Sequence, residues 1–339
     1  MRRLAINNIN MKISVIENTK TIHALNPQKK IGVFDFPFTA NLCIGCAYAC
    51  KYCFIPIVLH RQPSCLFPTV EVKVKMPTLF QQELQKLASI PQHLKRIQIN
   101  ESSDPYNPFV MHFMEHSLPV NPLIQLYETM KNEWANGNKW ILHILTKSNL
   151  ITRHIPFLEQ IKEMVQIEMS FCSSDESISR SMEPFTPTIK KRLDAIEQLA
   201  KKDLFVRVMA MPFYDDHADT EAFRTTTLNY GALAFKHKQL NYYDWQTLSQ
   251  TSVDDLLNDR LKRSTGKNNQ YFADLLLRSG EPILTPGKTN EVTVLMPDPQ
   301  IKQSWAVPSK INQRLTQQTI QLVDMGYSKI STVDWKYIK

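Results

Sequence analysis

The sequence predicts an α/β protein, built as a partial (βα)6 barrel with an appended C-terminal α+β subdomain. Two observations lead to this prediction. Short apolar segments alternate with amphipathic helical patterns up to about residue 240, and the connections between them are short, which favours parallel strands with right-handed crossovers. Beyond Asn241 the alternation loosens. We therefore expect a basic N-terminal extension (1–30), a barrel (31–240) and a C-terminal subdomain (241–339).

The expected elements follow from local patterns of apolar and polar residues. The barrel strands are expected at 38–42, 96–100, 140–146, 165–171, 204–211 and 232–237. Between them, helices are expected at about 122–136, 155–163, 188–202 and 219–228. Residues 70–76 alternate apolar and polar side chains, which indicates a strand, and Thr78 is expected to cap a helix that ends near Ile90. In the subdomain we expect helices at 250–263 and 268–279 and a strand at 292–296.

The fourth barrel strand has two chemically distinct faces, because successive side chains of a strand point to opposite sides. One face carries Gln166, Glu168, Ser170 and Cys172, and the other Val165, Ile167, Met169 and Phe171. The apolar face is expected to pack on helices and the polar face to line the lumen, as in a barrel that holds a buried polar ligand. An active site is then expected at the carboxyl ends of the strands.

Composition is that of a soluble globular protein, with 43% hydrophobic and 21% charged residues. No segment approaches the roughly 20 apolar residues that a membrane span needs. Arg2 and Arg3 are not followed by the apolar run of a secretory signal. We therefore expect a cytoplasmic protein without membrane association.

The formal net charge of +8 is concentrated at the two ends of the chain. Residues 1–30 hold six Lys and Arg against Glu17, and residues 301–339 hold six against Asp324 and Asp334. Basic ends on a near-neutral body favour binding of a polyanion such as nucleic acid. A solubilising surface is the alternative interpretation.

The cysteines carry the most specific signal. Cys43, Cys46, Cys50 and Cys53 lie within eleven residues, a density that indicates metal binding rather than disulfides in a cytoplasmic chain. The last three have the spacing C-x3-C-x2-C, which resembles the radical S-adenosylmethionine superfamily. The resemblance implies that Cys46, Cys50 and Cys53 hold a 4Fe–4S cluster whose fourth iron is chelated by S-adenosyl-L-methionine.

Zinc is the alternative metal, because all four cysteines together could close a tetrahedral site. Structural zinc usually places roughly a dozen or more residues between its two C-x2-C pairs, whereas Cys46 and Cys50 are separated by three. We favour the cluster and take Cys43 as a spectator near the end of the first strand. Zinc would make the chain a zinc-stabilised nucleic-acid-binding protein without catalysis.

Further segments resemble the spore photoproduct lyase-like group, whose members are often labelled DNA repair photolyases. They occur in the same order as in that group, over about residues 35–240: Ile99–Tyr106, Leu145–Ser148, Glu183–Pro184 and Lys191–Ile196. The resemblance implies a TIM-type partial barrel and lyase-like radical chemistry. It also implies that Tyr52 lies beside the adenine of the cofactor, and that Ser103, Lys147 and Ser170 contact its ribose or methionine end.

Alternatives remain for two of these residues. Lys147 could be a solvated lysine at a strand end, and Ser170 an ordinary small core residue. The chain also departs from the superfamily after the second strand, where Asn100–Ser103 replaces the common Gly-Gly-Glu.

The chain lacks one cysteine that the resemblance would supply. Spore photoproduct lyase carries a cysteine in the stretch after the second strand that returns a hydrogen atom to the substrate radical, but no cysteine lies between Cys65 and Cys172 here. Cys172 shares the expected lumen face with Ser170 and is the candidate catalytic donor. The alternative for Cys172 is a buried thiol that packs as a small hydrophobe.

The favoured function is therefore an iron–sulfur enzyme that reductively cleaves S-adenosyl-L-methionine to a 5′-deoxyadenosyl radical, which abstracts hydrogen from a substrate. A nucleic acid undergoing repair or modification is the favoured substrate, on the basic ends and the resemblance; a peptide or a small molecule is the alternative substrate. Such chemistry implies an external electron donor such as flavodoxin or ferredoxin.

Overall fold

A computed structural model describes residues 13–27, 37–50, 53, 55, 67–91, 94–213, 217–239 and 293–295. Its main sheet has six parallel strands in chain order and an antiparallel strand at each edge. The parallel strands are β3 (Phe38–Ala40), β6 (Arg96–Ile99), β7 (Ile141–Thr146), β8 (Val165–Phe171), β9 (Phe205–Phe213) and β10 (Ala234–Gln239). The edge strands are β2 (Asn26–Pro27) and β11 (Thr293–Leu295), which do not pair with each other within the described residues. The predicted partial (βα)6 barrel is confirmed, and it is open.

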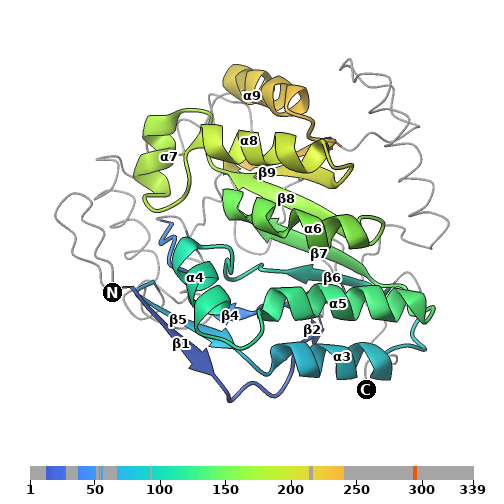
Figure 1. Ribbon diagram of the computed structural model, residues 1–339. Coiled ribbons are helices and arrows are strands. Elements are labelled where there is room, and N and C mark those ends of the chain that lie inside the picture. Colours follow the sequence, from blue (N-terminus) through green and yellow to red (C-terminus); the bar gives the residue numbers. More distant parts are fainter. Residues whose placement is uncertain are drawn as a thin grey trace, which may run out of the picture.

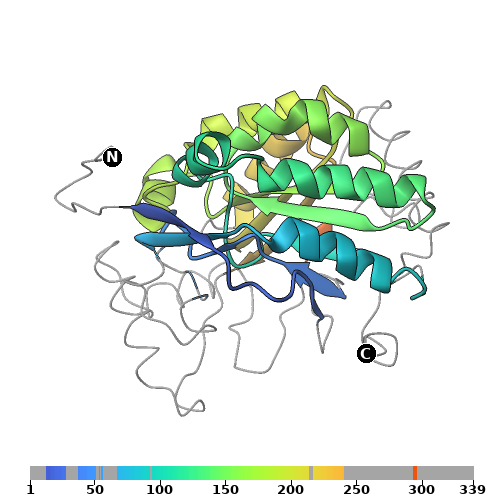
Figure 2. The same cartoon turned by 60° about the horizontal axis from the view of Figure 1, so that its bottom comes forward.

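Helices cover one face of this sheet (Figures 1 and 2). They are α3 (Met76–Lys86), α5 (Pro122–Ala135), α6 (Ile155–Leu158), α8 (Ile189–Ala200) and α9 (His217–Asn229). The short helices α4 (Pro108–His116) and α7 (Glu176–Met182) follow the ends of β6 and β8, and α4 lies against β1 (Ser14–Asn18). Each of the first five barrel strands is therefore followed by at least one helix before the next barrel strand begins.

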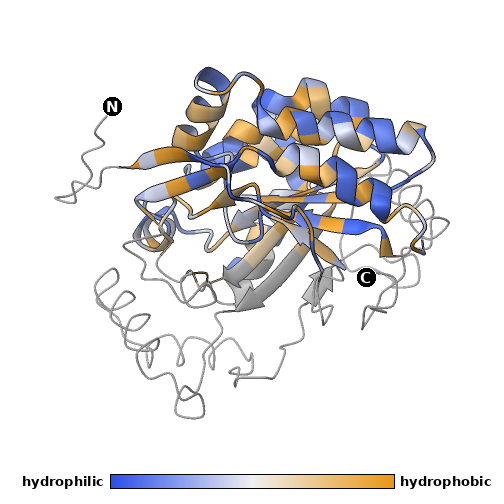
Figure 3. Ribbon diagram, turned by 90° about the horizontal axis from the view of Figure 1, so that it is seen from below, coloured by the Kyte–Doolittle hydropathy of each residue, from blue (hydrophilic) through white to orange (hydrophobic). Residues whose placement is uncertain are grey.

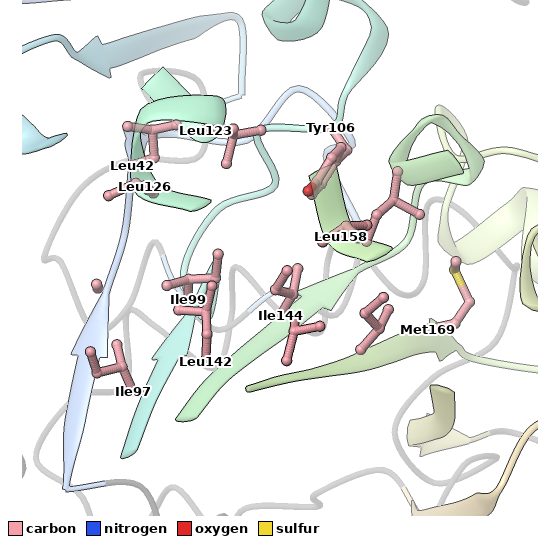
Figure 4. Packing of buried hydrophobic residues seen from close by; sticks show 14 of the residues in the cluster. Leu42, Ile97, Ile99, Tyr106, Leu123, Leu126, Leu142, Ile144, Leu158 and Met169 are labelled. Atoms are coloured by element: carbon pink, nitrogen blue, oxygen red, sulfur yellow. The ribbon is translucent and has the colours of Figure 1, made fainter. Parts of the chain in front are cut away.

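The core lies between the sheet and the helices. In Figure 4 the side chains of Ile99, Ile144 and Met169 project from the strands toward Leu123 and Leu158 of the helical layer, and all five are buried. Burying such a side chain fully contributes about 1.5–3 kcal/mol. The apolar face of β8 packs on helices as predicted, which leaves Glu168 and Ser170 on the opposite, concave face.

The helices are amphipathic, and Figure 3 shows hydrophilic and hydrophobic residues alternating along them. In α8, Leu193, Ile196 and Leu199 are buried at the spacing of one helical face. Thr188 caps this helix by accepting a hydrogen bond from the backbone N–H of Lys191. The one charged residue on the buried face of α8 is Arg192, which bears on the site described below.

A second, three-stranded sheet holds the segment that leads into the cysteines. Its central strand β5 (Thr69–Lys73) pairs in parallel with β1 and antiparallel with β4 (Cys43–Ile44). The strand expected at 70–76 is therefore present, but it lies outside the barrel. Part of the expected N-terminal extension pairs here, since β1 begins at Ser14; the division of the chain into three parts stays a prediction.

Some expected details are wrong. Thr78 does not cap α3, which begins at Met76 after Lys75 without a side-chain cap. Pro77 in the first turn explains this earlier start, because proline fits there without needing an N–H partner. The helix expected at 155–163 is the short α6 between two 3-10 turns, Asn149–His154 and Glu159–Ile161.

The C-terminal region is described only in part. The strand expected at 292–296 is present as β11, whereas the helices expected at 250–263 and 268–279 lie outside the described residues. Among the helices that the structure describes, none has the length and apolar character needed to cross a bilayer.

His154 gives a test of this helical layer. It is 3% exposed and packs edge-on against the rings of Tyr106, Tyr127 and Phe157. Burial, with a smaller contribution from Arg153, lowers its pKa to about 4. Between pH 4 and 6.5 the unfolded chain therefore binds a proton that the folded chain does not, so the free energy of unfolding falls as the pH falls through this window.

We expect His154→Phe to remove that part of the pH dependence. The difference in unfolding free energy between wild type and variant should change by about 3 kcal/mol between pH 7 and pH 4, measured by urea unfolding. Parallel stability curves for the two proteins would contradict the assignment.

Candidate active site

The cysteine loop begins directly after β4. Gly45 turns the chain with a φ of 84°, a conformation that favours glycine. Ala49 also has a positive φ, and the backbone N–H of Cys53 donates to the carbonyl of Cys50 at 3.1 Å. Cys50 is buried and Cys46 and Cys53 are partly exposed. The described part of the loop from Cys46 to Cys50 therefore follows a tight path.

The loop faces the carboxyl ends of the barrel strands. Burial raises the pKa of Cys50, the negative charge of Glu183 raises it further, and the positive charge of Lys147 opposes them. Burial likewise raises the pKa of Cys46 to about 12, and the next largest cause is Asp104, which follows β6. These interactions place the thiols beside the ends of β6 and β7.

Lys147 is the central cation of the site. Its side chain is 18% exposed, its Nζ donates to Ser170 Oγ at 2.6 Å, and it lies 3.3 Å from Glu183 Oε1. Burial is the largest influence and lowers the pKa of Lys147, but the negative charge of Glu183, with smaller contributions from Cys50 and Cys172, raises it overall. The structure therefore brings together two residues that the sequence analysis placed at the cofactor, Lys147 and Ser170.

Glu183 is anchored from its other side by Arg192. Both side chains are fully buried, and Arg192 NH1 lies 2.8 Å from Glu183 Oε2. The same guanidinium donates to the carbonyl of Ser170 and to Ser179 Oγ, at 2.8 and 2.9 Å. Removing one partner of such a buried pair would leave an uncompensated charge.

Asp104 organises the ends of β6 and β7. Its carboxylate accepts hydrogen bonds from the backbone N–H of Tyr106 and of Lys147, at 3.0 and 2.8 Å, and from the hydroxyl of Thr146. Burial raises the pKa of Asp104 to about 6, although these hydrogen bonds lower it. The carboxylate thus fixes the backbone from which Lys147 projects.

Buried polar atoms without partners lie along β6 and just after it. Ser103 Oγ, both side-chain polar atoms of Asn100 and Gln98 Nε2 have no hydrogen-bond partner in the described part of the chain. Asn100 also has a positive φ of 68°. A buried polar group left unpaired costs about 1–3 kcal/mol, and such a cost is typical of positions that a ligand completes.

Two further residues were predicted to belong to the site, Cys172 and Tyr52. Cys172 is fully buried beyond the end of β8, and its pKa is raised by burial and by Glu183. Lys147 and Cys50 also influence its charge, so it borders the same site. Tyr52, expected beside the adenine, lies outside the described residues.

Sequence reasoning assigned no role to several charged residues here. The segments that resemble the spore photoproduct lyase-like group contain Asp104, Glu183 and Arg192. Their presence in those segments was the only indication in the sequence that they belong to the site. Deeper in the lumen, Glu168 contacts Arg207 Nε and lies 3.4 Å from His143 Nε2, which is 2.7 Å from Arg207 NH2. The alternation of side chains along β8 predicted that Glu168 faces the lumen, but it did not predict the contacts of Glu168 with His143 on β7 and Arg207 on β9.

The thiols of the cysteine loop are the candidate ligands for a metal. Within the described residues, no group of three or more His, Cys, Asp or Glu side chains is arranged to hold a metal ion. Cys46, Cys50 and Cys53 nevertheless influence one another's charge, and thiolates are the usual ligands of iron–sulfur clusters. The donor chemistry fits a cluster, and metal binding by these residues stays a prediction.

The open parallel barrel is shared with solved structures. Spore photoproduct lyase with bound AdoMet and dinucleoside spore photoproduct superposes with a TM-score of 0.57, over 91% of this chain and 79% of that protein, at 12% sequence identity. The protein therefore shares the fold of spore photoproduct lyase. The lyase complexed with the dinucleoside alone gives 0.56 at 13% identity.

Sequence relatives match a smaller share of the chain than the solved structures do. An uncharacterised protein of Methanocaldococcus jannaschii is 26% identical over 216 residues, which are 63% of this chain and 73% of that protein. An uncharacterised protein of Mycobacterium tuberculosis is 26% identical over 203 residues, 58% of this chain and 55% of that protein, so the match spans about half of the mycobacterial protein. No protein-family model matches the chain.

Asp104→Ala tests the link between the two strand ends. It removes the acceptor for two backbone N–H groups in a buried setting, so we expect the free energy of unfolding to fall by about 3 kcal/mol, measured by urea unfolding. Asp104→Asn keeps one acceptor oxygen and should lose less. An alanine variant as stable as wild type would show that these hydrogen bonds do not hold the strand ends.

Proposed function

We propose that the protein is a radical S-adenosyl-L-methionine enzyme. The observation that carries the proposal is the convergence of the cysteine loop with the Lys147–Ser170 pair at the carboxyl ends of an open parallel barrel. The shared fold with spore photoproduct lyase supports it, although fold alone does not establish chemistry.

In this proposal each part of the site has a separate task. Cys46, Cys50 and Cys53 would hold a 4Fe–4S cluster, and Ser103, Lys147 and Ser170 would bind S-adenosyl-L-methionine, with Tyr52 beside its adenine. Such a cluster, when bound, supplies the electron that cleaves the cofactor to methionine and a 5′-deoxyadenosyl radical. The electron would come from a donor protein such as flavodoxin or ferredoxin.

In this proposal the residues of the chain bind the cofactor, orient it and shield it from water. Lys147 presents a positive charge, Ser170 fixes its direction, and Ser103 offers an unpaired buried hydroxyl to a ligand. The closed packing on the helical side of the strands keeps water from reaching the site through the sheet. Exclusion of water protects a reactive intermediate from side reactions.

For substrate we propose a nucleic acid, in a repair or modification reaction. The basic ends of the chain support this, as does the dinucleoside bound by the structural neighbour. We assign Cys172 as the hydrogen-atom donor, because its charge interacts with those of Lys147 and Cys50. Its S–H bond would break as a C–H bond forms on the substrate radical, and the thiyl radical left on sulfur would take up an electron from the donor protein and a proton from solvent. A cytoplasmic location accompanies this proposal.

Metal analysis of cysteine variants separates the cluster from zinc. Protein reconstituted anaerobically with iron and sulfide should form 5′-deoxyadenosine from S-adenosyl-L-methionine and dithionite. Cys50→Ala should lose most of its iron and this activity, because three thiolates are the minimum ligand set. Cys43→Ala should keep both, since Cys43 is not a cluster ligand in this proposal.

A different metal content would support the alternative function. A protein that holds about one zinc, loses it in both variants and leaves S-adenosyl-L-methionine intact would be a zinc-stabilised nucleic-acid-binding protein.

Isotope transfer tests the substrate and Cys172 together. With uniformly deuterated DNA or RNA oligonucleotides, deuterium should appear in 5′-deoxyadenosine by mass spectrometry. In D2O, wild type should return solvent deuterium to the oligonucleotide through the exchangeable thiol, and Cys172→Ala should not. Cofactor cleavage without transfer from either nucleic acid would rule out this substrate class, and unchanged return in the variant would remove Cys172 from the reaction.

A further inference from the structure

Glu183 connects three parts of the site and has no assigned role. It follows α7, it is fully buried, and its Oε1 lies 3.3 Å from the ammonium of Lys147 after β7. Its Oε2 lies 2.8 Å from the guanidinium of Arg192 on α8. One carboxylate therefore lies between two cations in a setting that excludes water.

Arg192 is held too firmly to turn toward a ligand. Its guanidinium donates to Ser170 O and Ser179 Oγ as well as to Glu183, and it lies over the ring of Phe171 at 4.8 Å. Planar guanidinium groups with several fixed hydrogen bonds are rigid anchors. Arg192 can therefore neutralise Glu183 and keep its carboxylate in place.

Lys147 differs from Arg192 because a lysine side chain is flexible and loses its proton readily when buried. Glu183 and Ser170 direct two of its three N–H bonds. Glu183, Arg192 and Lys147 together carry a net charge of +1, so the cluster of three can attract an anionic group. The thiols of Cys50 and Cys172 also influence the charge of Lys147, which in turn interacts with Asp104 and Cys46.

We propose that Glu183 is a positioning residue, which holds the charged Lys147 against Ser170 so that the ammonium meets the carboxylate of S-adenosyl-L-methionine. This inference rests on the proposed function. Glu183 does not touch the cofactor in this arrangement, and it acts through Lys147. A purely structural Glu183 would instead serve only to join α8 to the segment after α7.

The binding of two ligands distinguishes a positioning role of Glu183 from a purely structural one. S-Adenosyl-L-methionine carries the amino-acid carboxylate, whereas 5′-methylthioadenosine keeps the adenine and ribose and lacks that carboxylate. A misplaced Lys147 weakens binding of the first alone, while general damage to the site weakens both. Binding is measured by anaerobic equilibrium dialysis on the full-length, cluster-reconstituted protein.

For Glu183→Gln we expect about tenfold weaker binding of S-adenosyl-L-methionine, the size of one charge-assisted hydrogen bond. Binding of 5′-methylthioadenosine should change less than about twofold. Lys147→Met should give the same selective loss, and the double variant should lose no more than Lys147→Met, because both changes remove one interaction. Glu197→Gln, at an exposed ion pair on α8, is the matched control and should bind both ligands as wild type does.

Each failure has its own signature. If wild type does not bind S-adenosyl-L-methionine, the proposed function itself fails. If wild type binds it, then equal losses for both ligands in Glu183→Gln, no loss at all, or additive losses in the double variant would overturn the positioning role.

Glu183→Asp keeps the test available if the Gln variant does not fold. It retains the charge and the pairing with Arg192 but shortens the reach toward Lys147. We expect a smaller loss confined to S-adenosyl-L-methionine, and either a loss shared by both ligands or no loss would overturn the inference.

Discussion

The buried carboxylate of Glu183 between Lys147 and Arg192 is the interaction on which the rest of the site depends. An unpaired charge in this setting would cost several kcal/mol, so each of the three groups requires the other two. Arg192 binds the end of β8 through Ser170 O, and Lys147 binds the same residue through its hydroxyl. These polar contacts tie the ends of β7 and β8 to α8, in addition to the apolar packing between β8 and α8.

The two faces of the sheet have different tasks, and the apolar packing of one face offsets the cost of the buried charged groups on the other. One face packs against helices through residues such as Ile144, Ile167 and Met169, and this burial provides the driving force for folding. The other face is therefore free to carry costly groups, including the contacts among His143, Glu168 and Arg207. Unpaired buried atoms at Asn100 and Ser103 add to that cost on the same end of the sheet. Such features concentrate where function requires them.

The cysteine loop is positioned by a second sheet as well as by the barrel strand that precedes it. β4 pairs with β5, and β5 pairs with β1 from near the N-terminus. The loop follows barrel strand β3 by way of β4, and its position depends in part on β5 and β1, which lie elsewhere in the sequence. This explains why the spacing of the cysteines indicated a metal site, while the neighbours of that site could not be read from the motif.

The sequence by itself determined the strand order, the open barrel and the two faces of β8, because alternation and short connections are local properties. It also indicated a site at the strand ends, where the structure brings Lys147 to Ser170. Only the tertiary structure decided the partners: Glu183 and Arg192 stand nine residues apart on separate elements and meet Lys147, which lies 36 residues before Glu183. No local pattern encodes such a contact, because it arises when β7, β8 and α8 pack together. The position of Tyr52 beside the adenine and the geometry of the cluster stay predictions, because both depend on contacts outside the cysteine motif.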